Sequence, residues 1–143
     1  TKAELESRKE VLYETYIKTS NIEALTMIEM ASKQIVPAVI RYSKSLADTV
    51  LAVKEAGADA SVQAQLLGEV SRKLSDMKSA LSGLEEAVSR AGEIGDVREK
   101  AFFYKDVVKE AMTGLRKPAD ELEMLVDKKV WPIPTYGDLI FEV

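Results

Sequence analysis

The fold is decided by residues 74–88, LSDMKSALSGLEEAV, whose apolar residues recur at steps of three and four. That spacing places them on one side of a helix, as in helices that pack side by side in a bundle. The apolar positions of the stretch are Leu74, Met77, Leu81, Leu84 and Val88. The pattern extends backwards through Val70 and Leu67. We therefore predict one long helix over about residues 61–91.

Two helical patterns precede this segment. Residues 3–18 carry apolar residues at helical spacing, and residues 21–56 carry a longer run of the same kind. Gly57 lies in the short stretch 57–59, which is expected to turn the chain into the next helix. The two patterns are separated by Thr-Ser-Asn at residues 19–21, so they form either two helices or one.

Two local signals bear on that choice. Ser20 followed by Glu23 fits a capping box, which predicts a helix boundary or kink there, although the pattern could also run straight through. Pro37 lies inside the longer pattern. Because a proline lacks the N–H and its ring meets the carbonyl four residues back, we predict a kink at Pro37 rather than a stop.

The last helical pattern runs from about residue 96 to residue 130 and contains Pro118. The apolar residues before and after this proline lie on the same side of one continuous helix. The residue four positions earlier is Gly114, which obstructs a proline ring least. We therefore predict one kinked helix rather than two separate ones.

The C-terminal residues 131–143 cannot be helical at their start, because they begin Trp131-Pro132-Ile133-Pro134. Prolines at alternate positions force an extended course. Trp131, Ile133 and Tyr136 are too apolar to remain in water, so the tail is expected to fold back on the helices or dock on another part of the protein.

Together the patterns predict an all-α protein of a single domain, residues 1–143. The expected architecture is an antiparallel up-and-down bundle of three long helices, or four if Ser20 splits the first, followed by the extended Pro-rich tail 131–143. A chain that begins Thr-Lys-Ala-Glu, in the composition of mid-helix, looks like a piece of a longer protein.

Composition excludes several classes of function. The net charge is −4 and no basic stripe is present, which argues against nucleic-acid binding. No apolar run reaches the ~20 residues of a membrane span, and the lack of cysteine suits a cytoplasmic protein. Histidine is also absent, so Glu-x-x-His metal sites and histidine-based triads are ruled out. We expect no catalytic, cofactor-binding or metal-binding residue in this chain.

Aromatic and methionine residues could suggest a binding surface, but at helical spacing they are more typical of a core. Aromatic residues gather at Tyr13, Tyr16 and 102–104, and the five methionines lie on or beside the apolar faces. We interpret the aromatic residues as core with one hydroxyl in water, and the methionines as gap filling.

Two motifs together resemble a known family. The first is Ile35-Val36-Pro37-Ala38 followed by Arg41-Tyr42, and the second is the ending Trp131-Pro132-Ile133-Pro134-Thr135-Tyr136. In this order they resemble the C-terminal region of type III glutamine synthetases, and the similarity covers nearly the whole chain. The residues that match are Pro37, Arg41, Tyr42, Trp131, Pro132, Pro134 and Tyr136.

The resemblance implies a parent enzyme that joins ammonia to glutamate with ATP and Mg or Mn, through a γ-glutamyl phosphate, in a large oligomer. It also implies that the catalytic and metal-binding residues lie in an upstream domain. The matching residues would then have structural or docking roles, with packing, subunit contact or regulation as the function. The partners would be the catalytic domain and neighbouring subunits. The alternatives are an unrelated helical interaction or signalling module and, least favoured, a small helical enzyme.

Overall fold

The computed structural model describes residues 1–134, and every regular element in this range is helical. The elements are α1 (Lys2–Met30), the π-helical turn η1 (Ala31–Ile35), α2 (Val36–Glu55), α3 (Ser61–Gly92), α4 (Val97–Phe103), the π-helical turn η2 (Tyr104–Val108) and α5 (Lys109–Leu125). Because several elements follow each other without a break, they form three long helices. The prediction of an all-helical protein is confirmed for the described residues.

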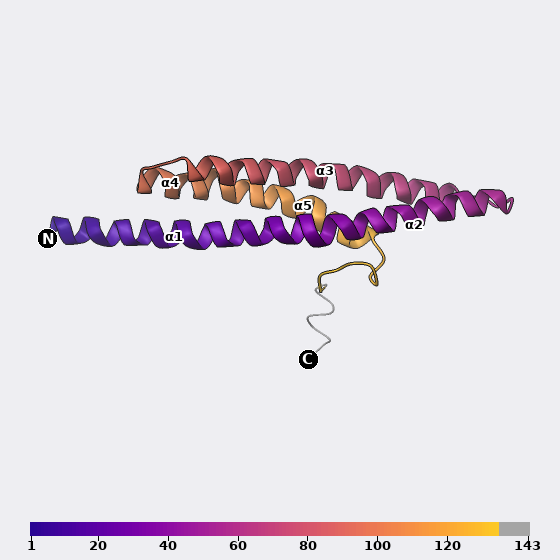
Figure 1. Ribbon diagram of the computed structural model, residues 1–143, viewed down its shortest axis with the longest axis horizontal. Helices are drawn as coiled ribbons and strands as arrows, with labels where there is room; N and C mark the ends of the chain where they lie inside the picture. Colours follow the sequence, from indigo (N-terminus) through magenta and orange to yellow (C-terminus); the bar gives the residue numbers. More distant parts are fainter. Residues whose placement is uncertain (135–143) are drawn as a thin grey trace.

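The three helices lie lengthwise beside one another (Figure 1). The rod made by α1 and α2 spans the molecule, α3 returns along it, and the α4–α5 helix runs back along α3. As a result the α4–α5 helix points in the same direction as α1. Beyond the end of α5, the far part of α2 and the first part of α3 form a two-helix arm.

The predicted boundary at Ser20 is wrong, because α1 continues through residues 19–21 without interruption. The capping box of this helix is at Thr1, whose hydroxyl accepts a hydrogen bond from the backbone N–H of Glu4. Asn21 has a tertiary role instead: its Oδ1 accepts a hydrogen bond of 3.0 Å from the hydroxyl of Tyr104. The polar residues in mid-helix therefore serve a contact with another helix, not a helix end.

The helix also continues through Pro37, as predicted, and it does so by means of η1. In this widened turn the N–H of Val36 donates to the carbonyl of Ala31, five residues earlier. The turn ends just before Pro37, whose ring would otherwise meet the carbonyl of Lys33. Figure 1 shows α2 continuing the line of α1 with a slight bend.

The heptad stretch of α3 forms the centre of the core. Met77, Leu81 and Leu84 have no exposed surface, whereas Leu74 and Val88 at its two ends are half-buried. The other large, fully buried side chains come from the neighbouring helices and from α3 itself: Leu115, Leu122, Val39, Val70 and Val108. The helix spans Ser61–Gly92, in agreement with the predicted range 61–91.

The last helix contains the buried Pro118, as predicted, but it ends at Leu125 rather than near Val130. Val126 is already extended, with φ −83° and ψ 144°. Asp127 then builds a turn, because its Oδ1 accepts the N–H of Lys129 at 2.9 Å. A side chain that binds its own local backbone competes with the helix, and here it outweighs a favourable apolar pattern.

One ion pair joins two long helices. Lys73 of α3 is paired with Glu121 of α5, and about one third of each side chain is exposed. The hydrogen bond from Lys73 is the main reason that the pKa of Glu121 lies below its usual value; the charges of Lys73 and Lys117 act in the same direction, and desolvation opposes them. Glu121 directly precedes the buried Leu122, so the pair lies at the edge of the core between α3 and α5.

We predict that Leu81→Ala lowers the free energy of unfolding by about 2–5 kcal/mol, because it leaves a cavity among fully buried side chains. Leu51→Ala is the matched control, since Leu51 is 63% exposed and its loss should change stability by less than about 0.5 kcal/mol. Urea unfolding followed by circular dichroism measures both. Equal effects of the two substitutions would contradict the assignment of the core.

We predict that Glu121→Gln destabilises the protein slightly at neutral pH and that its deficit shrinks in acid. A carboxyl group whose pKa is lowered by folding stabilises the fold above its unfolded-state pKa, and this contribution is lost as the pH falls through the folded-state pKa. Melting temperatures of wild type and variant across the acid range measure this convergence. Glu85→Gln, an exposed change on α3, is the control. A Glu121→Gln deficit that is the same at every pH would refute the role of the ion pair.

Candidate functional site

The first motif occupies the beginning of α2. Pro37 and Tyr42 are half-buried, and Tyr42 packs against the core. Arg41 is exposed, and within residues 1–134 its guanidinium makes no hydrogen bond or ion pair. The motif therefore combines two residues held by the fold with one cation that is available for an outside contact.

The second motif follows the turn at Asp127. Trp131 and Ile133 are half-buried and pack against the core, whereas Pro132 and Pro134 between and after them are exposed. The inward and outward positions alternate, as they do in an extended strand of chain. Tyr136 lies outside the described residues.

The structure does not bring the two motifs together into a reaction centre. In the described chain no hydrogen bond or ion pair connects residues 37–42 with residues 131–134. Residues 1–134 also contain no group of three or more acidic side chains that could hold a metal ion. The structural and docking roles assigned to the matching residues remain predictions.

An apolar groove, which the motifs did not predict, runs between α1, α3 and α5. We call it the methionine groove, because Met27, Met30 and Met112 line it and the buried Met77 forms part of its floor. Its volume is about 600 Å³. Ile133 of the tail also lines it, so the second motif begins beside this groove. The interpretation of the methionines as gap filling fits the buried Met77, but it is wrong for Met124, which is 88% exposed. Met27, Met30 and Met112 are half-buried along the groove.

The rim of the methionine groove is polar and of mixed charge. Glu23 and Thr26 lie on the α1 side, and Arg116 and Asp120 lie on the α5 side. One cation between two acidic residues gives the groove no strong preference for an anion or a cation. Its selectivity would therefore come from apolar contact.

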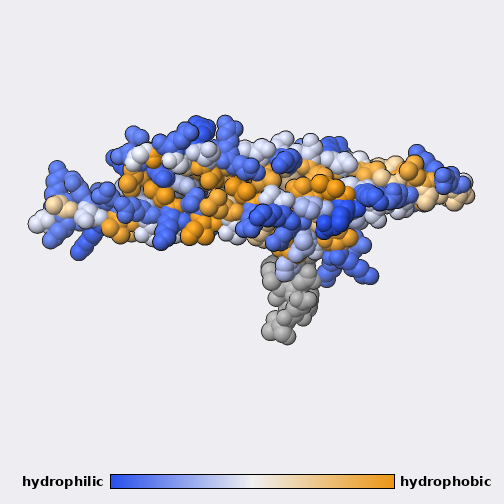
Figure 2. Space-filling model, in the orientation of Figure 1, coloured by the Kyte–Doolittle hydropathy of each residue, from blue (hydrophilic) through white to orange (hydrophobic). Residues whose placement is uncertain are grey.

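The outward side of α1 is a second unpredicted feature. Leu5, Val11, Leu12, Ile22 and Leu25 are 49–68% exposed, and we call them the α1 outer face. Figure 2 shows hydrophobic residues in orange between charged ones along this rod. Ala24 is the only buried residue of α1, so the apolar residues of its first half are not part of the core.

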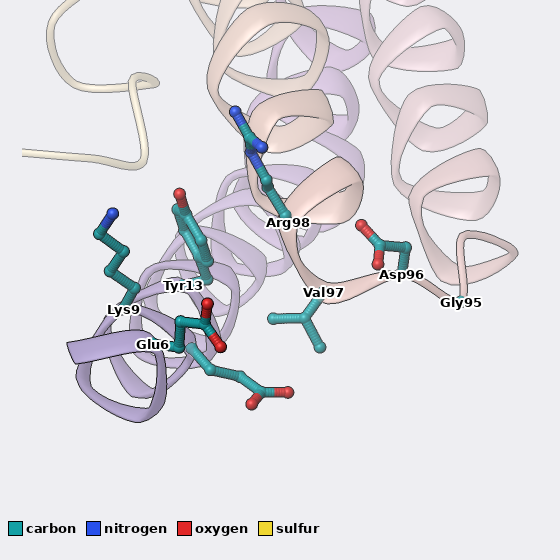
Figure 3. Close-up of a pocket in the computed structure, with 8 residues that line it drawn as sticks. Glu6, Lys9, Tyr13, Gly95, Asp96, Val97 and Arg98 are labelled. Carbon is teal, nitrogen blue, oxygen red and sulfur yellow. The ribbon is translucent and has the colours of Figure 1, made fainter. Parts of the chain in front are cut away.

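A hollow of mixed charge lies between the start of α1 and the α3–α4 connection (Figure 3). Tyr13, Lys9 and Glu6 approach it from α1, and Arg98 approaches it from α4. Asp96 on its edge is occupied in capping α4, where it accepts the N–H of Glu99 at 2.9 Å. The hollow is open to solvent and offers no nucleophile with an adjacent base.

Aromatic residues beside this hollow hold α4 against α1. The rings of Tyr13 and Phe102 are 6.2 Å apart, and the Arg98 guanidinium lies 5.6 Å from the centre of the Phe102 ring. Tyr104 is buried, and this desolvation raises the pKa of its hydroxyl. The prediction of an aromatic core is therefore correct for Tyr104, whereas Phe102 lies 40% exposed at the surface.

No helix among the described residues is long and apolar enough to cross a membrane. The methionine groove and the α1 outer face are both apolar, and neither contains a set of reactive groups.

Comparison with known proteins finds similarity to glutamine synthetases. Residues 1–54 match the family described as "Glutamine synthetase C-terminal domain", a range that covers α1, η1 and nearly all of α2. Over its whole length the chain is 34% identical to a glutamine synthetase of Butyrivibrio fibrisolvens, of which it covers 21%.

Two further relatives match 96% of the chain. They are a glutamine synthetase of Bacteroides fragilis (strain YCH46), with 30% identity, and a type-3 glutamine synthetase of Dictyostelium discoideum, with 28% identity. The chain spans about a fifth of the length of the relatives it matches. The chain is therefore similar to the C-terminal region of glutamine synthetases, a type-3 glutamine synthetase among them.

Proposed function

We propose that this chain is a non-catalytic docking domain of a glutamine synthetase. In this proposal the parent enzyme ligates ammonia to glutamate with ATP and Mg or Mn, and the reacting groups are held elsewhere in the parent. The family match supports the parent's identity. The lack of histidine in the whole chain is consistent with a helical part outside the reaction centre.

The observation that carries the docking role is the α1 outer face. Fully burying one leucine or isoleucine side chain contributes roughly 1.5–3 kcal/mol, and five such apolar side chains stand exposed along α1. The family match falls on the rod that carries them, since it ends within α2. Both the exposed apolar side chains of α1 and the position of the family match are explained if this surface is common to the family and is covered in the assembled protein.

The occupant of the α1 outer face is the catalytic part of the same polypeptide or of a neighbouring subunit. About four fifths of the length of the relatives lies outside the matched region, so a large protein surface is available. Arg41 lies on the same rod, and its guanidinium makes no hydrogen bond or ion pair with another residue of the described range 1–134. A carboxylate on the partner surface would complement it, since guanidinium and carboxylate bind through two parallel hydrogen bonds.

The proposal includes the form in which the chain docks. Residues 1–143 act as one unit, an antiparallel up-and-down bundle with an extended Pro-rich tail. The directions of the three helices and the half-buried Trp131 and Ile133 support this form. The acidic net charge and the lack of cysteine support a cytoplasmic enzyme without a nucleic-acid partner.

We predict that the isolated chain gives no γ-glutamyl transfer with ATP, Mg or Mn, glutamate and hydroxylamine. The reason is chemical, because the described surfaces hold no set of reactive groups. A colorimetric hydroxamate assay, with the full-length enzyme as positive control, measures the product. Turnover by a clean preparation of the chain would refute the non-catalytic role.

We predict that Leu12→Ser weakens the attachment of this domain within the full-length enzyme by roughly tenfold or more, because a buried apolar contact is lost. Sedimentation against protein concentration and limited proteolysis measure assembly and attachment. Val62→Ser is the matched control, since Val62 is 74% exposed and lies at the start of α3, away from the α1 outer face. An enzyme with Leu12→Ser that assembles and resists protease like the control would contradict the docking role.

A further inference from the structure

We propose that the methionine groove and a smaller polar cleft beside it form one binding site for an apolar α-amino acid, such as leucine, in its zwitterionic form. The polar cleft lies where α1 faces η2 and α5, and its volume is about 250 Å³. The ammonium and carboxylate groups lie where the two cavities meet, and the apolar side chain lies in the methionine groove. The site does not depend on the docking role of the α1 outer face, with which the groove shares only Ile22.

The two cavities adjoin each other along the contact between α1 and α5. Glu23 of α1 and Met112 and Arg116 of α5 line both of them. Beyond this boundary the polar cleft is rich in hydroxyl groups, whereas the methionine groove is mainly apolar. The hydroxyl groups of the polar cleft come from Tyr16, Thr19, Ser20, Tyr104 and Thr113. A small molecule at the boundary would therefore contact polar groups at one end and apolar side chains at the other.

The charged side chains of the two cavities balance each other. They are the acidic Glu23 and Asp120 and the basic Lys109 and Arg116. Within residues 1–134 none of these four side chains forms an ion pair or a hydrogen bond. Separate positive and negative groups of equal number favour neither an anion nor a cation, but they complement a molecule that carries both charges. An α-amino acid at neutral pH is the smallest common molecule of this kind.

The boundary offers a partner for each charge of such a molecule. The guanidinium of Arg116 can bind a carboxylate through two parallel hydrogen bonds. The carboxylate of Glu23, on the other wall, can accept a hydrogen bond from an ammonium group. Ser20 lies one helical turn before Glu23 and lines the polar cleft, so its hydroxyl can accept another. Ser20 and Glu23 fit a capping box in the sequence but cap no helix, and ligand binding gives this pair a role.

The methionine groove has the surface of a site for an apolar side chain. Met27 lies one helical turn beyond Glu23, Met30 follows after another turn, and Met112 lies on the opposite wall. Methionine side chains are unbranched and polarisable, so they adapt to aliphatic and aromatic partners alike. The groove volume of about 600 Å³ is within the usual range of ligand sites, about 300–1,000 Å³. The groove would therefore accept several apolar side chains.

Calorimetric titration of the intact 143-residue chain with L-leucine tests the ligand class. We expect a Kd of about 1 mM or tighter. Isocaproate lacks the ammonium group, isoamylamine lacks the carboxylate and glycine lacks the side chain, so each should bind at least roughly tenfold more weakly. Binding of any of these three as tight as that of leucine would overturn the proposal. Equal binding of isocaproate would indicate a groove for any apolar group, such as a partner protein could supply. No binding of leucine at about 10 mM would also overturn it.

Two substitutions test the residues at the boundary. Glu23→Gln and Arg116→Gln should each weaken leucine binding by roughly tenfold, because each removes one charged partner. Both residues are exposed, so the fold should be retained, and circular dichroism checks this. Glu14→Gln and Arg72→Gln are the matched controls, since both residues are exposed and line neither cavity. An unchanged Kd in Glu23→Gln and Arg116→Gln would contradict the assigned site.

Oxidation of the methionines shows independently where leucine binds. Hydrogen peroxide converts an accessible methionine to its sulfoxide, and mass spectrometry measures the rate at each position. Saturating L-leucine should slow the oxidation of Met27 and Met112 by roughly three- to tenfold. Met124 is 88% exposed and lines neither cavity, so its rate should not change. Rates at Met27 and Met112 that are the same with and without leucine would overturn the placement of the side chain in the groove.

Discussion

The rest of the structure depends on the apolar, water-excluding contact that α3 makes with the two helices beside it. Met77, Leu81 and Leu84 exclude water from this contact, and Leu115 and Leu122 of α5 are equally buried. The α1–α2 rod and the α4–α5 helix both contact α3, and they also contact each other, mainly through α1 and α4. The ion pair Lys73–Glu121 links α3 and α5 at the edge of the core. Both apolar surfaces follow from this arrangement, because it leaves one side of α1 uncovered and a groove where α1 and α5 diverge over α3.

Most of the fold could be predicted from the sequence because its strongest signals are local and periodic. The bounds of α3 and the continuation of helices through Pro37 and Pro118 followed from apolar spacing and from the steric demands of proline. The errors at Ser20 and after Leu125 have one cause. Short polar side chains can bind either local backbone or a distant partner, and the sequence does not show which one is present. Asn21 binds Tyr104 across the bundle, whereas Asp127 binds its own turn.

The candidate site was less predictable. The two motifs carried the resemblance to glutamine synthetases. Within the described residues, the first contains a proline that follows the widened turn η1, and the second begins with Trp131, which packs against the core. The surfaces open to a partner are defined by which side of a helix remains uncovered, and this depends on the other helices. Met27 and Met112 are 85 positions apart in sequence, so no spacing rule could unite them in one groove. In α1 the sequence did contain a sign of an exposed apolar surface. Its apolar residues do not all lie on one side of the helix, since Leu5, Leu12 and Leu25 do not share the side of Ala24.

The widened turn η1 has a consequence for how this helical rod can change in evolution. An α-helix advances about 100° per residue, so the extra residue accommodated by a π turn rotates everything that follows by roughly that angle. Upstream of η1 the rod contacts mainly the α4–α5 helix, and downstream it contacts mainly α3. The turn thus changes which side of the continuous helix faces the bundle, so the helix contacts different neighbours before and after η1. Insertion of a single residue between Met30 and Pro37 would keep every existing side chain yet direct Val39 and Leu46 away from α3. Relatives should therefore tolerate substitution in this segment far more readily than a change in its length.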